Sequence, residues 1–372
     1  MQSRLGLIVN PIAGMGGRVG LKGSDGEETL RRARELGAGP LAASRADRAL
    51  ARLERCRDEL SVVAGARSMG GDVARARGFA TETVSAGASD ETTAADTRAA
   101  AADLERRGVD LILFAGGDGT TRDIVDAIGT RVPILGIPTG VKMHSGVFAT
   151  SPEAAGDIAF SAFSGARPLE LREAEVMDVD EDALRDGRIS ARLHAVARVP
   201  HDRARVQNPK AASRSGDVEL DALCRDLAAE AAADGLMLFG PGTTTKRILT
   251  HLGLEGTPLG VDAVERGELV ASDLNETQLL ELVADRDARL VVAVVGGQGF
   301  VFGRGNQQLS PAVIRRVGLE NLVLLASVDK VVSLDPPVLR VDTGDLDLDR
   351  ELAGYRAVRV APNRSLVMRI SP

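Results

Sequence analysis

One apolar stretch limits the fold of this chain more than any other feature. Residues 110–115 read Asp-Leu-Ile-Leu-Phe-Ala, and all but the first are apolar. A strand without a polar face must be buried on both sides, which is typical of inner strands in a parallel sheet. The stretch ends in a glycine-rich loop, residues 116–120, and a helical pattern follows to about residue 128. This order of strand, loop and helix predicts an α/β fold.

The same alternation extends over residues 1 to about 150. The predicted strands are short apolar stretches, at 4–9, 60–64, 83–86 and 132–137. The predicted helices are charged or amphipathic stretches, at 26–36, 41–60 and 91–107. For the last of these helices we expect Ser89 and Asp90 to form the N-terminal cap. Strands and helices at this spacing indicate a parallel, doubly wound sheet.

The pattern changes from about residue 165. Residues 169–179 and 189–199 predict two strands around a turn, as in a hairpin of a β-rich second domain. Helix and strand then alternate again, so the second domain is a β-containing α/β unit. We predict a nucleotide-binding domain at 1–150, a second domain of mixed β and α structure at 151–350, and two closing strands at 351–372. Whether the closing strands return to the first domain is left open.

Composition and charge exclude several classes of partner. The chain carries a net charge of −7, and its aromatic content is 2% with no Trp. An acidic surface disfavours nucleic acid and anionic lipid, and single-stranded nucleic-acid binders also need aromatic stacking platforms. No apolar run approaches the roughly 18 residues of a membrane span. We expect a cytoplasmic protein with a small-molecule substrate, no nucleic-acid partner, no membrane partner, and a homo-oligomeric state.

The glycine loop at 116–120 has the chemistry of a phosphate site. Gly116, Gly117 and Gly119 lack Cβ atoms, so the backbone can approach an anion and direct N–H groups at it. The following helix adds the positive end of its dipole, and Thr120 adds a hydroxyl donor. Asp118 would repel a phosphate, so its place in this loop indicates a carboxylate that accepts a proton or lies near a metal. The alternative is that Asp118 caps its own helix.

Two later loops repeat this arrangement. A strand pattern at 236–239 leads into a Gly/Thr loop, and Thr243, Thr244, Thr245 and Lys246 stand at the start of the next helix. Lysine is scarce in this chain, and Lys246 resembles a lysine that grips a phosphate; the alternative is a solvated residue. A third glycine run, at 296–299, has the weaker claim, since turns between strands and helices often need glycine.

These motifs together resemble a known family. Residues 116–120 match the Gly-Gly-Asp-Gly-Thr signature of the superfamily of NAD kinases, diacylglycerol and sphingosine kinases and phosphofructokinases. Asn10-Pro11 with the glycines that follow resembles their N-terminal loop. Residues 135–148 lie where NAD kinases carry a glycine-rich loop that ends in Gly-Phe. The chain is therefore similar to the ATP-NAD kinase-like family, including its branch with acetoin-catabolism protein X.

The resemblance implies a set of roles. Asp118 would be the base that activates the acceptor hydroxyl, Gly116, Gly117, Gly119 and Thr120 would line the phosphates, and Asn10 would support them. The implied cofactors are ATP and Mg²⁺, with NAD as substrate; no metal ligand is assigned. Further candidates for binding come from the later loops: Thr139, Gly140, Lys142, His144, Thr243, Thr244, Thr245, Lys246 and Arg304. For Arg304 a domain-bridging contact is the alternative, and Asn275-Glu276 is interpreted as a helix cap.

The sequence thus predicts a kinase that phosphorylates NAD to NADP with ATP or polyphosphate. One alternative is a kinase of the same fold that acts on another small hydroxyl compound. The other is a nucleotide-binding regulator without catalysis. In this family a Gly-Ser-Thr-Ala-Tyr-like loop holds NAD, and this sequence has no clear counterpart of it. The prediction of a kinase therefore rests on the first domain, and the identity of the acceptor is less firmly predicted.

Overall fold

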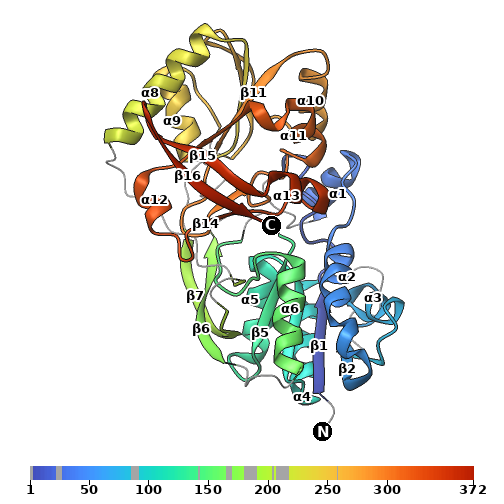
Figure 1. The fold of residues 1–372 in the computed structure, drawn as a ribbon. Helices are drawn as coiled ribbons and strands as arrows, with labels where there is room; N and C mark the ends of the chain where they lie inside the picture. Colours follow the sequence, from blue (N-terminus) through green and yellow to red (C-terminus); the bar gives the residue numbers. More distant parts are fainter. Residues whose placement is uncertain are drawn as a thin grey trace.

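The computed structural model describes residues 3–21, 27–84, 92–140, 143–164, 170–179, 191–202, 205–206, 218–257 and 259–372. The described chain forms two domains, one above the other (Figure 1). The first half of the chain, blue to green, forms the lower domain, apart from α1 (Glu27–Glu35), which lies at the level of the upper domain, and the second half, yellow to red, forms the upper domain. The C-terminus lies where the two meet.

The first domain is built on a sheet of five parallel strands in the order β3-β2-β1-β4-β5. The chain adds strands on one side of β1 and then returns to add them on the other, so the order reverses between β1 and β4. In open α/β sheets this reversal point is where ligands bind, outside the carboxyl ends of the strands. The strands are β1 (Ser3–Val9), β2 (Leu60–Ala64), β3 (Thr81–Thr83), β4 (Leu111–Gly116) and β5 (Ile134–Pro138).

Helices cover both faces of this sheet. α2 (Ala42–Leu53) and α6 (Pro152–Phe163) bury their apolar residues with alternate strand residues such as Leu7 and Leu113. α4 (Ala94–Arg106) and α5 (Asp118–Ile128) do so on the opposite face, with Ile8 and Phe114. Strands buried on both sides explain the uniformly apolar pattern of β4. The prediction of a doubly wound parallel sheet is confirmed.

A two-stranded antiparallel hairpin, β6 (Leu171–Val179) and β7 (Ala191–Pro200), packs on the first domain. Val176 and Val199 are buried in one cluster with Phe114 and Ile124 from β4 and α5. The hairpin itself was expected, but its packing differs from the expected division at residue 150, which grouped it with the second domain. The reason is that apolar residues on the inward face of the hairpin pack against apolar residues of α5. A contact between elements this far apart in the chain is not visible in a local sequence pattern.

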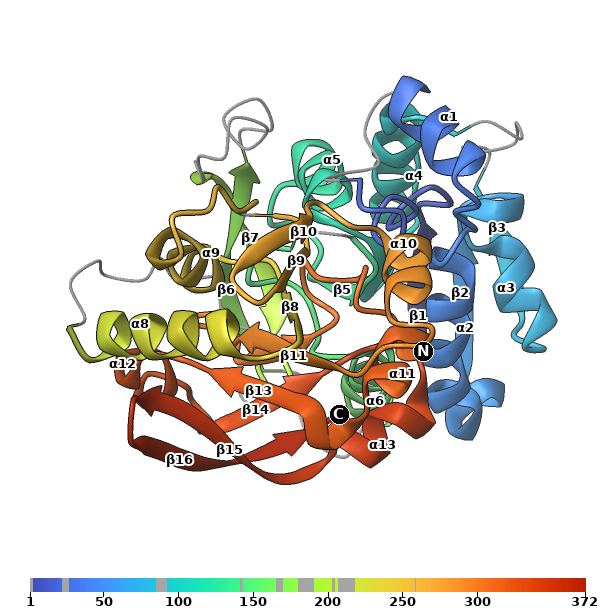
Figure 2. The same ribbon diagram turned by 90° about the horizontal axis from the view of Figure 1, so that it is seen from above.

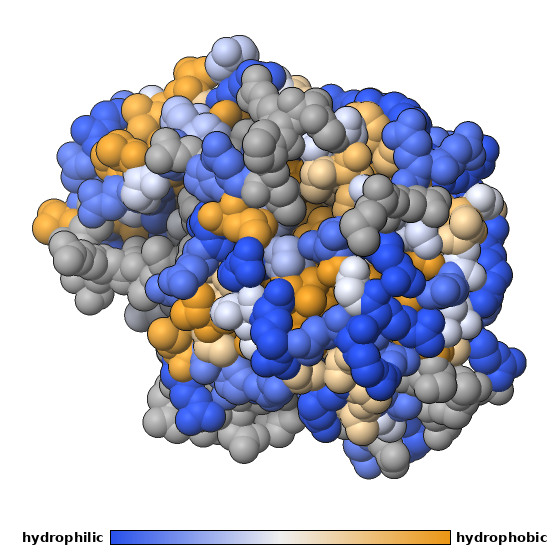
Figure 3. Space-filling model, turned by 90° about the horizontal axis from the view of Figure 1, so that it is seen from below, coloured by the Kyte–Doolittle hydropathy of each residue, from blue (hydrophilic) through white to orange (hydrophobic). Residues whose placement is uncertain are grey.

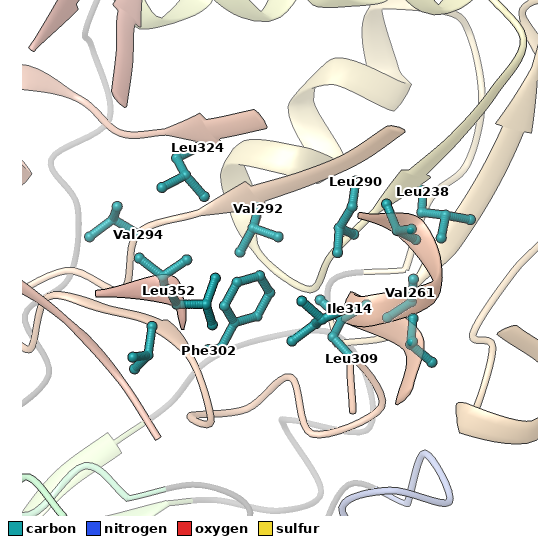
Figure 4. Close-up of a cluster of buried hydrophobic side chains, with 14 of the residues drawn as sticks. Leu238, Val261, Leu290, Val292, Val294, Phe302, Leu309, Ile314, Leu324 and Leu352 are labelled. Carbon is teal, nitrogen blue, oxygen red and sulfur yellow. The ribbon is translucent and has the colours of Figure 1, made fainter. Parts of the chain in front are cut away.

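The second domain is built on a nine-stranded mixed sheet in the order β10-β9-β8-β11-β13-β15-β16-β14-β12. Its core contains Leu290, Val292 and Phe302 (Figure 4). The tail forms β15 and β16, which pair with each other and with the inner strands of this sheet. The strands are β8 (Leu236–Phe239), β9 (Asp262–Glu265), β10 (Glu268–Ala271), β11 (Ala288–Ala293), β12 (Phe300–Phe302), β13 (Leu322–Leu325), β14 (Val338–Val341), β15 (Gly354–Ala361) and β16 (Arg364–Ser371).

The remaining helices lie around these sheets. Seen from above, α8 and α9 lie toward one end of the second domain, with α10 and α11 at the other (Figure 2). They are α1 (Glu27–Glu35), α3 (Gly71–Ala76), α8 (Val218–Ala233), α9 (Thr243–His251), α10 (Glu276–Leu282), α11 (Pro311–Val317), α12 (Val328–Val332) and α13 (Leu346–Leu352), with short 3₁₀ turns at Glu54–Glu59, Arg67–Met69 and Leu319–Asn321.

Several expected boundaries were wrong. The strand expected at 83–86 is β3, which spans Thr81–Thr83, and residues 85–86 lie outside the described residues. Helix α4 begins at Ala94 and is capped by Thr93, whose hydroxyl accepts from the Asp96 N–H while the Asp96 carboxylate accepts from the Thr93 N–H. This reciprocal capping box takes the place of the predicted cap at 89–90, which lies outside the described residues. Helix α2 ends at Leu53, and 3₁₀ geometry continues to Glu59.

The described residues contain no helix long and apolar enough to cross a membrane. On the face seen from below, hydrophilic residues are mixed with scattered hydrophobic ones (Figure 3).

Candidate active site

The candidate site lies at the carboxyl ends of β1, β4 and β5. β1 runs upward from the N-terminus at the bottom of the molecule, so these ends point toward the second domain (Figure 1). The loops after β1 and β4 flank the reversal point of the sheet. The predicted phosphate loop at 116–120 therefore stands where a parallel sheet offers a crevice for a ligand.

Asp118 stands in the first turn of α5, and Gly117 is the N-cap residue. The Asp118 carboxylate accepts two backbone hydrogen bonds from the loop after β5. Its Oδ2 accepts from the His144 N–H at 2.7 Å, and its Oδ1 accepts from the Ser145 N–H at 3.1 Å. α5 has no side-chain cap, so the alternative that Asp118 caps its own helix is wrong. A carboxylate has about four lone-pair sites, so each oxygen can still accept another hydrogen.

The first glycine-rich loop is bonded to the second. Asn10 Nδ2 donates to Thr120 Oγ1 at 2.9 Å, and the Asn10 N–H donates to the Ala115 carbonyl. Gly116 makes this approach possible, because a Cβ there would lie 2.5 Å from the Thr120 Cβ. Asn10 thus fixes the hydroxyl of Thr120 at the start of α5. Its contribution to binding phosphate stays a prediction.

The loop after β5 packs against both glycine-rich loops. The N–H groups of Thr139 and Gly140 donate to the Gly116 carbonyl at 3.1 and 3.2 Å. A Cβ on Gly140 would lie 2.7 Å from the Gly117 Cα, and a Cβ on Gly14 would lie 2.1 Å from the Thr139 carbonyl oxygen. The Thr139 hydroxyl donates to the Ile137 carbonyl and is buried. Thr139 and Gly140 therefore shape the site through their backbone. Lys142, the other candidate here, lies outside the described residues.

The segment that supplies the N–H groups to Asp118 is itself held by β5. Gly136 donates its N–H to the Val147 carbonyl and accepts from the Ala149 N–H. A Cβ on Gly136 would lie 2.3 Å from the Phe148 ring, so glycine is needed for this close packing. The Phe148 ring meets Phe114 edge-on, with centroids 5.7 Å apart. The Gly-Val-Phe end of the loop thus anchors the segment that contacts Asp118.

His144 is buried beside the candidate base. Its Nδ1 lies 3.4 Å from Asp118 Oδ2 but makes no hydrogen bond within the described residues. The bond to Asp118 comes from the backbone of His144 instead. The structure therefore brings His144 into the site, with its imidazole next to the carboxylate.

The later Gly/Thr loop lies in the second domain. Thr244 and Thr245 are buried at the start of α9, whereas Thr243 and Lys246 are exposed. The Thr245 hydroxyl donates to the Gly242 carbonyl. Among the described residues, no hydrogen bond or ion pair joins these four residues to the first domain. Because β8 and β11 are parallel neighbours, this loop shares a sheet edge with the third glycine run, which does contact the first domain.

Arg304 lies in a buried ion cluster between the domains. Its Nη1 donates to Asp342 Oδ2 at 2.7 Å, and its Nη2 donates to the Thr150 carbonyl at 3.1 Å. Arg45, from α2, also pairs with Asp342 and donates to the Pro138 carbonyl at the end of β5. Of the two expected roles of Arg304, the structure shows the domain-bridging one. The contacts give the phosphate role no support.

Charge balance in this cluster is reflected in the pKa of Asp342. Burial alone would raise it, but the charges of Arg45 and Arg304 outweigh burial and lower the pKa to about 2. The Asp342 side chain has no exposed surface, and that of Arg304 is 4% exposed. Removal of any one of these three side chains would leave a buried charge without its partner, which destabilises the folded protein.

Sequence reasoning missed three of the residues that join the domains. Arg45 is one of many arginines and carried no signal. Asp342 follows a short strand pattern at 338–341, which by itself does not indicate a contact between domains. Gln298 lies in the third glycine run, whose resemblance to the first was the only hint. The interpretation of Asn275 as a cap is confirmed, since it forms a capping box with Gln278 on α10.

We expect Gly140→Ala to destabilise the protein by about 1–3 kcal/mol, because the new Cβ would overlap backbone at Gly117. We also expect ATP to bind about tenfold more weakly, since α5 would move away from the loop after β5. Urea denaturation and calorimetric titration with ATP measure the two effects. Gly39→Ala is the control, because nothing lies within 4 Å of a Cβ there. Equal behaviour of the two variants would contradict the role given to this contact.

The parallel sheet of the first domain and the mixed sheet of the second define a two-domain α/β protein, with the Asp118 carboxylate at the N-terminus of α5. Residues 5–165 match the family model of the ATP-NAD kinase N-terminal domain, and residues 234–370 match that of the ATP-NAD kinase C-terminal domain. Together the two models span most of the chain. The chain belongs to the ATP-NAD kinase family.

Other comparisons add little. No curated protein matches the chain. Two solved structures, each described as "a putative diacylglycerol kinase from Bacillus anthracis str. Sterne", are 14% identical and cover 48% of this chain, with a TM-score of 0.26. The matches span 46% and 43% of those chains, less than half of their length. A likeness at this level carries no argument about activity.

Proposed function

We propose that this protein is a kinase that transfers a phosphoryl group from ATP, or from polyphosphate, to the 2′-hydroxyl of the adenosine ribose of NAD, and so makes NADP. The observation that supports this proposal most is the position of the Asp118 carboxylate and the hydrogen bonds that hold it. Its carboxylate is held by two backbone N–H groups at the start of an uncapped helix, in the ligand crevice of a parallel sheet. The match of both halves of the chain to ATP-NAD kinase domains makes NAD the acceptor to test first.

The residues present fit a nucleotide phosphate. The first N–H groups of a helix have no partner within it, and α5 has no side-chain cap. Gly117 and Gly119 are half-buried, and the nearest atom to a Cβ on Gly119 is 3.8 Å away, at the end of the Arg122 side chain. The backbone there is therefore open to an anion, and the helix dipole favours negative charge.

The described residues contain no group of three His, Cys, Asp or Glu side chains that could hold a metal. A divalent ion that accompanies the triphosphate would be held mainly by phosphate oxygens, as is usual for Mg²⁺. When bound, it would neutralise charge on the transferred group. The protein's own contribution is then to position the substrates and to remove the proton.

In the proposed reaction the acceptor O–H bond breaks and its proton passes to a carboxylate oxygen of Asp118. The acceptor oxygen forms a bond to the γ-phosphorus while the bond from that phosphorus to ADP breaks. Phosphoryl transfer depends mostly on positioning and charge stabilisation, so α5 and the glycine loops would contribute more than the base alone.

The test is an acceptor screen. Purified protein with ATP and Mg²⁺ is incubated with NAD, and NADP is measured with an NADP-specific dehydrogenase while ADP release is followed in parallel. We expect equal amounts of NADP and ADP, and polyphosphate in place of ATP identifies the donor. ADP release with a panel of other hydroxyl compounds, but not with NAD, would overturn the choice of acceptor. ATP binding without turnover on any acceptor would overturn the enzyme proposal in favour of a regulator.

A further inference from the structure

The turn between β11 and β12 reaches from the second domain into the candidate site. It contains Gln298, which is buried, and its Nε2 donates to the Met143 carbonyl at 2.8 Å. The residues on both sides, Gly297 and Gly299, have positive φ values of 76° and 74°. Residues with a Cβ rarely adopt this conformation, so the two glycines allow the tight turn that presents Gln298.

The peptide that Gln298 contacts is the one that holds Asp118. The Met143 carbonyl and the His144 N–H belong to a single peptide unit, and that N–H donates to Asp118 Oδ2 at 2.7 Å. One amide of the second domain is therefore connected to the candidate base by two hydrogen bonds through a single planar group. A carbonyl that accepts a hydrogen bond polarises its peptide, which strengthens the donor on the other side.

The other side of this segment is fixed by the first domain. The Ser145 hydroxyl accepts from the Met177 N–H at 3.0 Å, and the Gly146 N–H donates to the Glu175 carbonyl at 2.9 Å. Both partners lie on β6. The N–H groups of residues 144 and 145 thus depend on two supports, the hairpin of the first domain on one side and Gln298 of the second domain on the other.

We propose that Gln298 is a positioning residue for Asp118, because it orients the Met143–His144 peptide that donates to the carboxylate. The orientation of the carboxylate then depends on how the second domain is docked on the first. This inference rests on the proposed function in taking Asp118 as the base. The consequence is that the base is aligned only when the two domains are docked. A displacement of a catalytic group by about 1 Å can cost on the order of 100-fold in rate, so the effect is measurable.

The primary variant is Gln298→Met, which keeps the length of the side chain but removes the donor. We expect kcat to fall about tenfold and the KM for ATP to change less than twofold, because the phosphate-binding loops are untouched. Gln278→Met is the matched control. It removes an amide from the capping box of α10, in the same domain, and should leave kcat unchanged. Thermal melts of both variants check that they fold.

A double-mutant cycle separates positioning from a general structural effect. If Gln298 acts through Asp118, Gln298→Met should reduce kcat in the wild-type background and have almost no further effect in Asp118→Asn. Equal losses in both backgrounds would overturn the proposal. Should the Met variant fail to fold, Gln298→Glu keeps the length and polarity but offers no donor when ionised, and the same cycle applies.

A second measurement needs no turnover. Hydrogen exchange of the His144 amide, followed by NMR, should accelerate about tenfold in Gln298→Met, while amides in α2 keep their wild-type rates. Unchanged exchange at His144 would overturn the proposal. If wild-type protein transfers no phosphoryl group from ATP, the proposed function fails, and the exchange rate still decides whether Gln298 supports this peptide.

Discussion

Asp118→Asn is expected to lower kcat by about 10²- to 10⁴-fold, the usual contribution of a general base. The amide cannot accept the proton of the acceptor hydroxyl. The KM for ATP should not rise, because the substitution removes a negative charge from the vicinity of the phosphates. Initial rates over a range of ATP and NAD concentrations separate the two parameters. A loss that appears only in the KM for ATP would mean that Asp118 shapes the phosphate site and does not act as a base.

The matched control for this variant lies on the same helix. Asp123 forms an ion pair with Arg98 of α4, and among the described residues no hydrogen bond or ion pair joins it to the segment at 143–146. Asp123→Asn should keep kcat within about threefold of the wild type. Asp118→Asn places an NH₂ group opposite a backbone N–H, which costs about 1–3 kcal/mol of stability. Both variants are therefore compared below their unfolding transitions, and a kcat of Asp118→Asn equal to that of Asp123→Asn would contradict the proposed base.

Asp342→Ala is expected to reduce the free energy of unfolding by about 3–5 kcal/mol. The substitution leaves Arg304 buried without its carboxylate and removes the partner of Arg45. Breaking a buried ion pair costs this much, because the remaining charge is neither solvated nor compensated. Urea denaturation followed by circular dichroism measures the change. Asp347→Ala is the control, since Asp347 forms an exposed pair with Arg350 and should cost less than about 1 kcal/mol. Equal costs would show that the cluster is not a principal link between the domains.

The same carboxylate gives a pH dependence of known sign. The pKa of Asp342 is lowered in the folded protein from its ordinary value of 3.8 to about 2. Such a group contributes stability that is fully present above pH 3.8 and is lost as the pH falls through about 2. The contribution is about 2 kcal/mol. Wild-type protein should therefore lose that much more stability than Asp342→Ala between about pH 4 and pH 2. A similar decline in both proteins would place the acid sensitivity elsewhere.

Much of the fold could be predicted because the relevant signals are local. β2 and β8 have the predicted bounds. Short apolar stretches with turn residues at both ends specify such strands almost independently of context. Predicted helix ends were wrong where a single capping side chain decides where the helix begins. Thr93 caps α4 because its hydroxyl reaches the N–H of Asp96, and the sequence offers several serine, threonine and aspartate residues nearby that have the same chemistry.

The site divides in the same way. The position of the candidate site could be predicted from the loop at 116–120, because its three glycines surround a carboxylate between a buried strand and a helix. The hydrogen bonds of Asp118 could not be predicted, because its partners are backbone N–H groups 26 and 27 residues further along the chain. Gln298 and Arg45 were unpredictable for the same reason. Glutamine and arginine are common surface residues, and only the approach of two domains makes them bridges.

By itself, the sequence determined that the chain has a parallel α/β first domain with a glycine-rich loop at Gly116 to Thr120, because strand burial, glycine and helix starts are properties of neighbouring residues. The tertiary structure decided how that loop is completed. It brought the segment at 143–146 onto Asp118, packed the hairpin on α5, and joined the domains through Arg45, Arg304 and Asp342. Each of these depends on contacts between residues far apart in the chain, where a pattern in the sequence carries no information about distance.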